Sequence, residues 1–260
     1  DSFAAFQREI LTRNPLLDFD RMLLVRRDFD ESATSPSLST ARKVISTSLG
    51  MPSLNSHTHD TIRHNGWQNE IAVLSDLRGG GYLETLYKPE QDHILCEVDL
   101  EFDAERIMFS SIGANDRWAV FEMDSNSEGL KQLTPDDLPD VDFFDSCYLP
   151  DGRIPVTSTA PYQGLPCEYG KKPMASLYLL DPETQEIRRT TYEQDSDWSP
   201  VVRPDGRLMY LRWEYTDTPH YFTRILMSCN PDGTSQMEVY GSNSYFPNAY
   251  FYPRPIPDTT

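Results

Sequence analysis

The stretch RPDGRLMYLR at residues 203–212 decides the fold, because its pattern occurs three times along the chain. The related stretches are LPDGRIPVTS at residues 149–158 and FDAERIMFSS at residues 102–111, and the equivalent arginines of the three copies are 47 and 54 residues apart. In the two PDG copies a tight turn precedes the apolar segment, since proline presets φ and glycine accepts a positive φ. A repeat of this length is typical of a β-propeller blade.

Each turn and strand is followed by a segment that reads as a hairpin. Three hairpins lie at residues 118–134, 176–191 and 224–240, and a fourth at residues 69–87 has residues 21–28 as its preceding strand. We therefore predict an all-β propeller built of blades of about 50 residues with four short strands each, about four blades being present. A β-sandwich also has many short strands, but it does not predict a strand order that repeats at this interval.

The repeat also sets the predicted domain organisation. Residues 1–18 show helical periodicity and are predicted to be a helical or extended lead-in, while residues 19–260 form the propeller. A fifth blade is predicted to begin at SYFPNAYFYPRPIP, residues 244–257. We expect the chain to be part of a larger propeller, or half of one that another polypeptide completes, with an open blade edge that favours pairing with another chain.

Composition and missing motifs exclude several classes of function. With 23 Lys and Arg against 41 Asp and Glu, the net charge of −18 disfavours a nucleic-acid partner, which normally meets a basic patch. No apolar run approaches the roughly 18 residues of a transmembrane helix. The sequence has no CxxCH haem-attachment motif, no GxSxG nucleophile elbow, no P-loop and no GxGxxG. We predict no catalytic activity for this stretch alone.

The loops between the second and third strands of the blades are the predicted functional face. If the strands of a blade are named a to d from the axis outwards, the b→c and d→a connections emerge on one face of the propeller. The b→c loops are predicted at residues 29–68, 159–174 and 213–222, and they are long and rich in reactive side chains. Because function concentrates on loops held by a rigid scaffold, we expect the site on this face.

Three of these loops carry candidate metal ligands. His57 and His59 alternate, which would place two imidazoles on one side of an extended segment, although a solvated polar loop fits the same residues. Cys167 is a candidate thiolate ligand, with a lone buried thiol or a disulfide with Cys147 as alternatives. His220 is a candidate ligand or general base, with a hydrogen-bonded loop histidine as the alternative.

Ligand or partner binding is predicted at the end of the last PDG repeat. A cation, an aromatic platform and a carboxylate stand side by side there, as a sugar or another polar ligand requires, while an inter-blade salt bridge with stacking is the alternative reading. The predicted binding residues are Arg212, Trp213, Glu214, Tyr215, Asp217, His220 and Tyr221.

Acidic residues near the predicted inner strands form a further candidate set. They could line a central channel and hold Ca²⁺, or they could cap turns. These residues are Glu97, Asp99, Asp142, Asp145, Asp195 and Asp197.

The blade order predicts how the loop residues lie in space. We expect Cys167, Trp213, His220 and Tyr221 on the same face, with the loop of His57 and His59 nearby. Blades three and four would bring Cys167 towards His220. A thiolate with an imidazole suits zinc.

Three stretches resemble the middle domain of the hydrazine synthase alpha subunit family. They are residues 205–257, which include RWEYTDTPHYF and YGSNSYFPN, then YLPDGRIPVTST with LPC at residues 148–167, and RNPLLDFDRMLLVRR at residues 13–27. The family consists of secreted or periplasmic bacterial proteins with a TolB-like propeller, so the resemblance implies a periplasmic or extracellular location. It also matches Cys167 to a propeller cysteine that ligates zinc near a haem. Since this chain lacks CxxCH, the resemblance does not imply hydrazine synthesis here.

Two functions follow as hypotheses. The first is an extracytoplasmic propeller module that binds a protein, the remainder of its own polypeptide, or a small polar or glycan ligand on the b→c face. The second is a metal-binding or haem-adjacent scaffold within a multidomain oxidoreductase, with zinc or calcium as the candidate ions. Metal analysis separates the two hypotheses.

Overall fold

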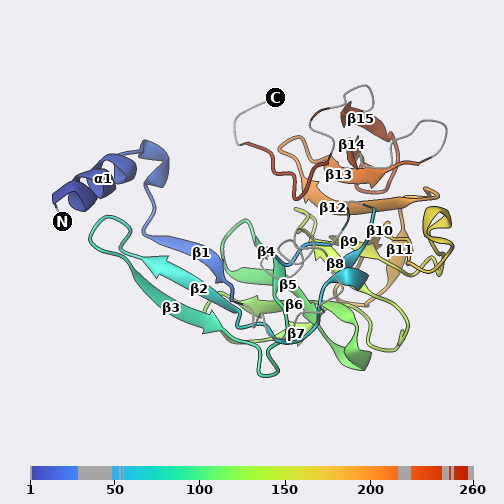
Figure 1. Ribbon diagram of the computed structural model, residues 1–260, viewed down its shortest axis with the longest axis horizontal. Coiled ribbons are helices and arrows are strands. Elements are labelled where there is room, and N and C mark those ends of the chain that lie inside the picture. Colours follow the sequence, from blue (N-terminus) through green and yellow to red (C-terminus); the bar gives the residue numbers. More distant parts are fainter. Residues whose placement is uncertain are drawn as a thin grey trace.

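Strands dominate this computed structural model (Figure 1). The chain begins with helix α1 (Ser2–Thr12) and a short 3-10 turn η1 (Pro15–Leu17). No helix in the part of the chain that the structure describes is both long and apolar enough to cross a membrane. The structure describes residues 2–28, 49–52, 54, 56–215, 224–241, 246 and 249–256.

Fifteen strands in the described residues form four antiparallel sheets that follow one another along the chain. The first sheet has the order β1-β2-β3. Its strands are β1 (Arg21–Arg26), β2 (Glu70–Ser75) and β3 (Tyr82–Tyr87). The second has the order β4-β5-β6-β7. Its strands are β4 (Cys96–Leu100), β5 (Arg106–Ile112), β6 (Trp118–Asp124) and β7 (Lys131–Gln132).

The other two sheets repeat the same meander. The third sheet contains β8 (Phe143–Ser146), β9 (Ile154–Ser158), β10 (Ser176–Leu180) and β11 (Ile187–Arg189). The fourth contains β12 (Ser196–Val202), β13 (Leu208–Trp213), β14 (Arg224–Cys229) and β15 (Met237–Tyr240). The all-β propeller class is thereby confirmed, with three strands rather than the predicted four described in the first blade.

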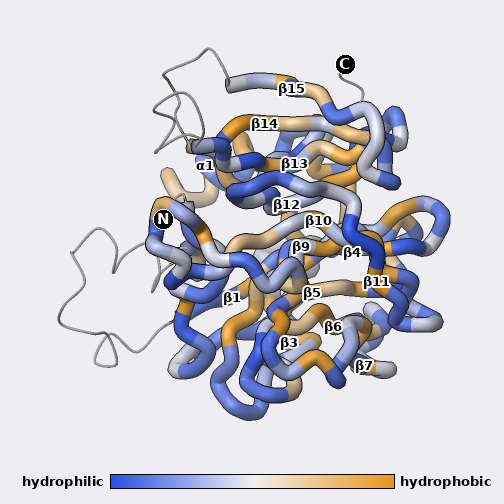
Figure 2. The backbone as a smooth tube through the Cα atoms, turned by 90° about the vertical axis from the view of Figure 1, so that its right-hand side faces the viewer, coloured by the Kyte–Doolittle hydropathy of each residue, from blue (hydrophilic) through white to orange (hydrophobic). Residues whose placement is uncertain are grey.

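The strands form because both faces of an inner blade are buried against neighbouring blades. In β5, Ile107 and Phe109 pack towards the first blade, while Met108 between them packs towards the third. In β10, Leu177 packs towards the fourth blade and Tyr178 towards the second. This alternation follows from the two-residue period of a strand. Figure 2 shows hydrophobic stretches along several strands, such as β6 and β14, and many hydrophilic residues in the connections.

The predicted turns have the backbone conformation that their glycines allow. Gly152 and Gly206 lie in the two PDG turns with φ of 86° and 80°. An L-residue rarely adopts this left-handed conformation, whereas glycine does so without a steric penalty. These turns therefore set the register between the first and second strands of blades three and four.

The four sheets form an arc in which β1–β3 and β12–β15 lie at opposite ends. Buried apolar clusters join the first blade to the second, the second to the third, and the third to the fourth. Among the described residues no such cluster joins β12–β15 to β1–β3, and Figure 1 shows these sheets at opposite ends of the arc. One face of each end blade is therefore left without a neighbouring blade in this part of the chain.

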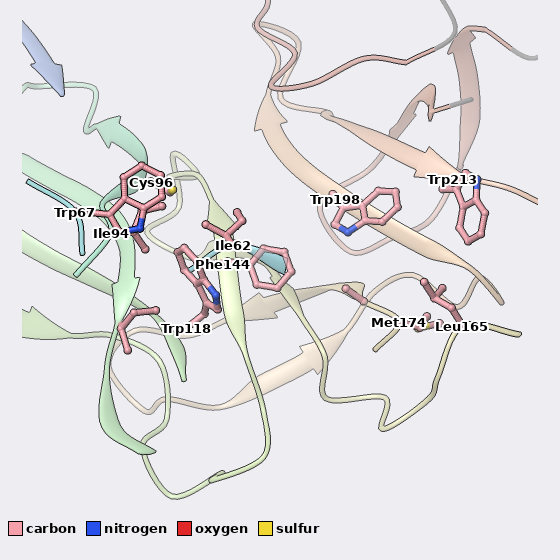
Figure 3. Close-up of a cluster of buried hydrophobic side chains, with 12 residues drawn as sticks. Ile62, Trp67, Ile94, Cys96, Trp118, Phe144, Leu165, Met174, Trp198 and Trp213 are labelled. Atoms are coloured by element: carbon pink, nitrogen blue, oxygen red, sulfur yellow. The ribbon is translucent and has the colours of Figure 1, made fainter. Parts of the chain in front are cut away.

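A fourth buried cluster lies where the blades meet and includes every tryptophan of the chain. Trp67 comes from the first blade, Trp118 from the second, and Trp198 and Trp213 from the fourth. Figure 3 shows these rings with Phe144 and Cys96 between the blades. The centre of the arc is thus packed with aromatic side chains.

Candidate functional site

The innermost strands of three blades share one irregularity. Glu97 in β4, Asp145 in β8 and Ser199 in β12 have φ of 47°, 47° and 52°. The pairing of each inner strand with its neighbour shifts register around that residue. A left-handed conformation costs a non-glycine residue about 1–2 kcal/mol, and a bulge re-aims the side chain that it carries. Because the bulge recurs in three blades, we infer that it serves to direct these side chains towards the centre of the arc.

His59 reaches these strands from the b→c loop of the first blade. The short helix η4 (His59–Thr61) presents its imidazole, which stacks on Phe144 at 4.1 Å between ring centroids and meets Trp118 edge-on at 4.7 Å. The His59 Nε2 atom lies 2.9 Å from Oε1 of Glu97 and 4.0 Å from Oδ1 of Asp145. Residues of three blades therefore converge on one histidine.

Further polar groups complete this site, which we call the axial cluster (His59, Cys96, Glu97, Asp145 and Tyr252). The Tyr252 hydroxyl donates to Oε1 of Glu97 at 3.1 Å. The backbone N–H and the hydroxyl of Ser199 donate to Oδ2 of Asp145, each at 3.1 Å. The cluster is thus assembled from segments far apart in the sequence.

Burial and neighbouring charges set the protonation of the cluster. Burial alone would lower the pKa of His59 and raise that of Glu97, but their mutual attraction prevails, so the pKa of His59 is raised and that of Glu97 is lowered. Burial, and then the charge of Glu97, raise the pKa of Asp145 to about 6. The contact between His59 and Glu97 therefore favours the charged form of each side chain.

A cation and a cavity border the axial cluster. The guanidinium of Arg224 stacks over Trp198 at 4.1 Å and donates to the backbone oxygen of His57 at 3.0 Å. A cavity of about 160 Å³ reaches the cluster at Cys96, Glu97 and Tyr252. It is lined by Arg27, Leu49, Gly50, Cys96, Glu97, Val98, Tyr252 and Arg254. Burial, and then Glu97, raise the pKa of the Cys96 thiol well above its usual value.

A second, larger pocket lies between blades three and four. Its volume is about 420 Å³, and it is formed by the b→c loop of the third blade and the connection from β11 to β12. This loop pocket is lined by Gln163, Gly164, Pro166, Arg189, Tyr192, Glu193 and Gln194. Because antiparallel strands alternate in direction, both connections emerge on the same face of the propeller.

The loop pocket combines an aromatic ring with charged and amide side chains. Tyr192 is 72% exposed, and the Arg189 guanidinium lies 4.8 Å from its ring centroid. Glu193 lies 3.2 Å from Arg212, and burial raises the pKa of the Glu193 carboxyl although Arg212 opposes the change. Arg212 links this pocket to the binding residues that the sequence predicted.

Other members of that predicted set lie beside the loop pocket. Trp213 is fully buried and stacks on Tyr215 at 5.8 Å between centroids, while Glu214 is half-buried and Tyr215 is exposed. The Tyr215 N–H donates to Asp195 at 2.8 Å. Arg212 and Trp213 are both buried within the fourth blade, where Arg212 pairs with Asp197 of the neighbouring strand β12. The remaining three, Asp217, His220 and Tyr221, lie outside the described residues.

The predicted metal ligands are distributed over different places. His59 lies in the axial cluster, but the Nε2 atom of His57 instead lies 3.4 Å from Glu168. Cys167 is half-buried in η6 (Pro166–Glu168) and packs against the central apolar cluster. Lys172 and Asp60 form an ion pair at 2.7 Å that joins the first- and third-blade loops, so the loop of His57 and His59 does lie beside that of Cys167. The approach of Cys167 to His220 falls outside the described residues.

The cysteines of the chain all fall within the described residues and are free thiols. The alternative of a disulfide between Cys147 and Cys167 is therefore wrong. Cys147 is buried between blades three and four, whereas Cys167 lies near the centre. Burial raises the pKa of both thiols, which is expected of cysteines in apolar surroundings.

Sequence reasoning missed Cys96 and Tyr252 as members of a site. It named Glu97 and Asp145 among the acidic residues near inner strands, without His59 beside them. The repeat did contain one signal for these positions, namely a polar residue at a nearly constant distance before the turn arginine. Glu97 lies 9 residues before the turn arginine of its blade, and Asp145 and Ser199 lie 8 residues before theirs. The polar residue at this repeat position marks the bulge.

Comparison with known proteins shows the fold. No protein-family model and no curated protein matches the chain. Among solved structures, hydrazine synthase of Kuenenia stuttgartiensis matches with a TM-score of 0.61 at 14% identity, over 85% of this chain and 32% of that one. A putative TolB from Agrobacterium tumefaciens matches with a TM-score of 0.51 at 17% identity, over 66% of this chain and 57% of that one.

An oligogalacturonate lyase in complex with manganese matches with a TM-score of 0.50 at 13% identity, over 88% of this chain and 52% of that one. The chain thus spans about a third to a little over half of the length of these proteins. At these identities the likeness concerns architecture and not activity. The chain is structurally similar to TolB-like β-propellers, which hydrazine synthase, oligogalacturonate lyase and TolB share as a fold.

Proposed function

We propose that this chain is a binding module of a larger propeller protein and that its loop pocket receives a small polar ligand, a neutral saccharide being the class that fits best. One observation carries the proposal: an exposed aromatic ring, Tyr192, stands in an open pocket beside two exposed amide side chains, Gln163 and Gln194. The extracytoplasmic location remains a prediction of the sequence.

The chemistry of the pocket supports a ligand rich in hydroxyl groups. The two amides each offer a donor and an acceptor, as a saccharide hydroxyl requires. Tyr192 is held in place because its hydroxyl donates to the backbone oxygen of Arg189 at 3.1 Å, so its ring is oriented before a ligand arrives. Pre-ordered polar groups around an apolar surface are typical of ligand sites.

The charges of the pocket favour a neutral ligand over an ionic one. The Arg189 guanidinium already donates to the backbone oxygen of Thr191 at 2.7 Å and to Ser176 at 3.0 Å. Glu193 faces Arg212. Since the Arg189 donors already have acceptors and the charge of Glu193 is balanced by Arg212, the pocket gains little from a charged ligand.

A panel of neutral and acidic oligosaccharides, screened by saturation-transfer NMR and followed by calorimetry, tests this proposal. We expect binding of a neutral saccharide that Tyr192→Ala weakens by about tenfold, a typical effect of losing an aromatic contact. Tyr82→Ala, which removes an exposed tyrosine of the first blade, is the matched control. Binding that survives Tyr192→Ala, or no binding by any member of the panel, would contradict the loop pocket as a saccharide site.

A further inference from the structure

We propose that the axial cluster is a zinc site, with His59, Cys96 and Glu97 as ligands and Asp145 as the fourth. This inference does not depend on the loop pocket, because the axial cluster lies in the centre of the arc and involves other residues. It also differs from the ligands predicted from the sequence, since it replaces Cys167 by Cys96.

The donor atoms are already gathered. The nitrogen of His59, the sulfur of Cys96 and a carboxylate oxygen of Glu97 lie within 4.8 Å of one another, the one such group of three among the described residues. Ligand atoms of a tetrahedral zinc ion are about 3.4 Å apart, given metal–ligand distances of 2.0–2.3 Å. Side-chain movements of about 1 Å would close the set.

Unpartnered polar atoms point to something that the protein atoms do not supply. The Nδ1 atom of His59, Oε2 of Glu97 and Oδ1 of Asp145 are buried and have no hydrogen-bond partner among the described residues. A buried polar atom without a partner destabilises the folded protein, because it has lost its hydrogen bonds to water. The two carboxylates face the same histidine, through its Nε2 atom, and a cation bound between them would satisfy both.

The backbone is shaped around these groups. Glu97 and Asp145 occupy equivalent bulges in β4 and β8. Both adopt a left-handed backbone conformation, which is energetically unfavourable for residues other than glycine. A fold gains nothing from placing two carboxylates together in its interior. The same bulge at Ser199 brings a hydroxyl to Asp145, so the three bulges together direct the two carboxylates, and a donor that orients one of them, to the same place.

The donor set selects the ion. Calcium and magnesium prefer oxygen ligands throughout, whereas one imidazole, one thiolate and one or two carboxylates suit zinc. The cavity of about 160 Å³ gives the ion a route, since Cys96 and Glu97 line it.

The surrounding charges are compatible with a cation carrying three anionic ligands. Arg27 lies 3.9 Å from the Cys96 sulfur, and Arg224 is buried on the side of Asp145. Arg254 lines the cavity and lies 3.9 Å from Asp99. Zinc with one thiolate and two carboxylates carries a charge of −1, which the neighbouring arginines offset.

The test uses the full chain, freed of metal by a chelator and titrated with zinc and with cobalt. We expect one zinc ion per chain after dialysis, and a thiolate-to-cobalt charge-transfer band in the cobalt form. Cys96→Ser should remove the band, and Cys96→Ser and Glu97→Gln should each weaken zinc binding at least about tenfold. Cys147→Ser is the matched control, because Cys147 is also a buried free thiol but lies between blades three and four.

Cys167→Ser distinguishes the two candidate sulfurs and should leave both readouts unchanged. Loss of the cobalt band in that variant, or no retained zinc in the parent protein, would overturn the proposal. If the Cys96 variant does not fold, X-ray absorption of the zinc-loaded parent decides, since one sulfur with nitrogen and oxygen neighbours is expected, and none or several would refute it. Saccharide binding in the loop pocket is measured separately, so either proposal can fail alone.

Discussion

At the scale of single residues, Arg212 shows what a buried cation requires. Its guanidinium donates to Asp197 at 2.9 Å and to Gln236 at 2.8 Å, and it lies 3.2 Å from Glu193. Burial opposes the charge, but the attraction of Asp197 prevails and raises the pKa of Arg212. The residue therefore depends on its partners rather than on solvent.

Removing the main partner should leave this charge uncompensated. We expect Asp197→Ala to lower the free energy of unfolding by about 3 kcal/mol, because breaking a buried pair costs roughly 3–5 kcal/mol and the other partners soften the loss. Urea denaturation measures the change. Asp205→Ala, which breaks an exposed pair with Arg203, should cost less than about 1 kcal/mol. Equal losses in both variants would contradict this account.

Asp142 predicts a pH dependence of stability. Burial raises the pKa of its carboxyl, although the N–H of Trp118 and the charge of Arg117 oppose the change. A raised pKa in the folded state means that the native protein binds the proton more tightly than the unfolded chain does. The contribution of Asp142 to stability is therefore fully present below its unfolded pKa, near 4, and is lost as the pH rises through its folded pKa.

Asp142→Asn has no such titration but keeps an acceptor for the N–H of Trp118. The stability of the variant relative to the parent should accordingly increase between about pH 4 and neutrality, and then stay constant. Chemical denaturation at four pH values measures both profiles. If the two profiles ran parallel, the protonation of Asp142 would not contribute to the pH dependence of the free energy of unfolding.

At the scale of elements, a blade is held by what its strands bury on each side. Leu180 in β10 is fully buried between blades two and three. We expect Leu180→Ala to lower the free energy of unfolding by about 3 kcal/mol through lost burial and the cavity that remains. Leu83→Ala in β3, where the side chain is 48% exposed, is the control and should change it by less than about 0.5 kcal/mol.

The repeat in the sequence predicted these elements because turns and strands are local. The PDG turns and the alternation in RLMYLR need no distant partner, so the strands of blades two to four could be located from the sequence. Trp213 was assigned to a loop, but β13 extends through it and carries its ring into the central cluster. Trp213 is buried because β13 ends one residue later than predicted, and this extension depends on the pairing of Trp213 with Arg224.

The axial cluster was largely beyond the reach of the sequence for a different reason. His59, Cys96 and Asp145 come from three blades, so only the packing of the blades brings them together. Glu97 and Asp145 were recognised as acids near inner strands, but their bulges are irregularities of pairing rather than of composition. The alternating pattern of a strand does not show where the pairing of that strand is interrupted by a bulge.

At the scale of the whole molecule, the fourth blade leaves apolar side chains uncovered. Met237 in β15 is 57% exposed and pairs across from Ser228. Exposed apolar edge strands favour pairing with another chain. We expect the isolated chain to associate with increasing concentration, and Met237→Lys to reduce the association, as measured by sedimentation velocity. Phe102→Lys, at an exposed turn, is the control and should leave it unchanged. A parent protein that stays monomeric at all concentrations would contradict this expectation.

The gathering of all four tryptophans in one central cluster has a practical consequence for spectroscopy. Intrinsic fluorescence of this protein reports on the place where the blades meet and not on the outer strands. Quenching by acrylamide should be weak in the folded state, and fraying of β15 or β3 should leave the emission maximum where it was. Far-ultraviolet circular dichroism would register that fraying. A difference between the two optical signals during unfolding would therefore show the periphery of the arc separating before its centre.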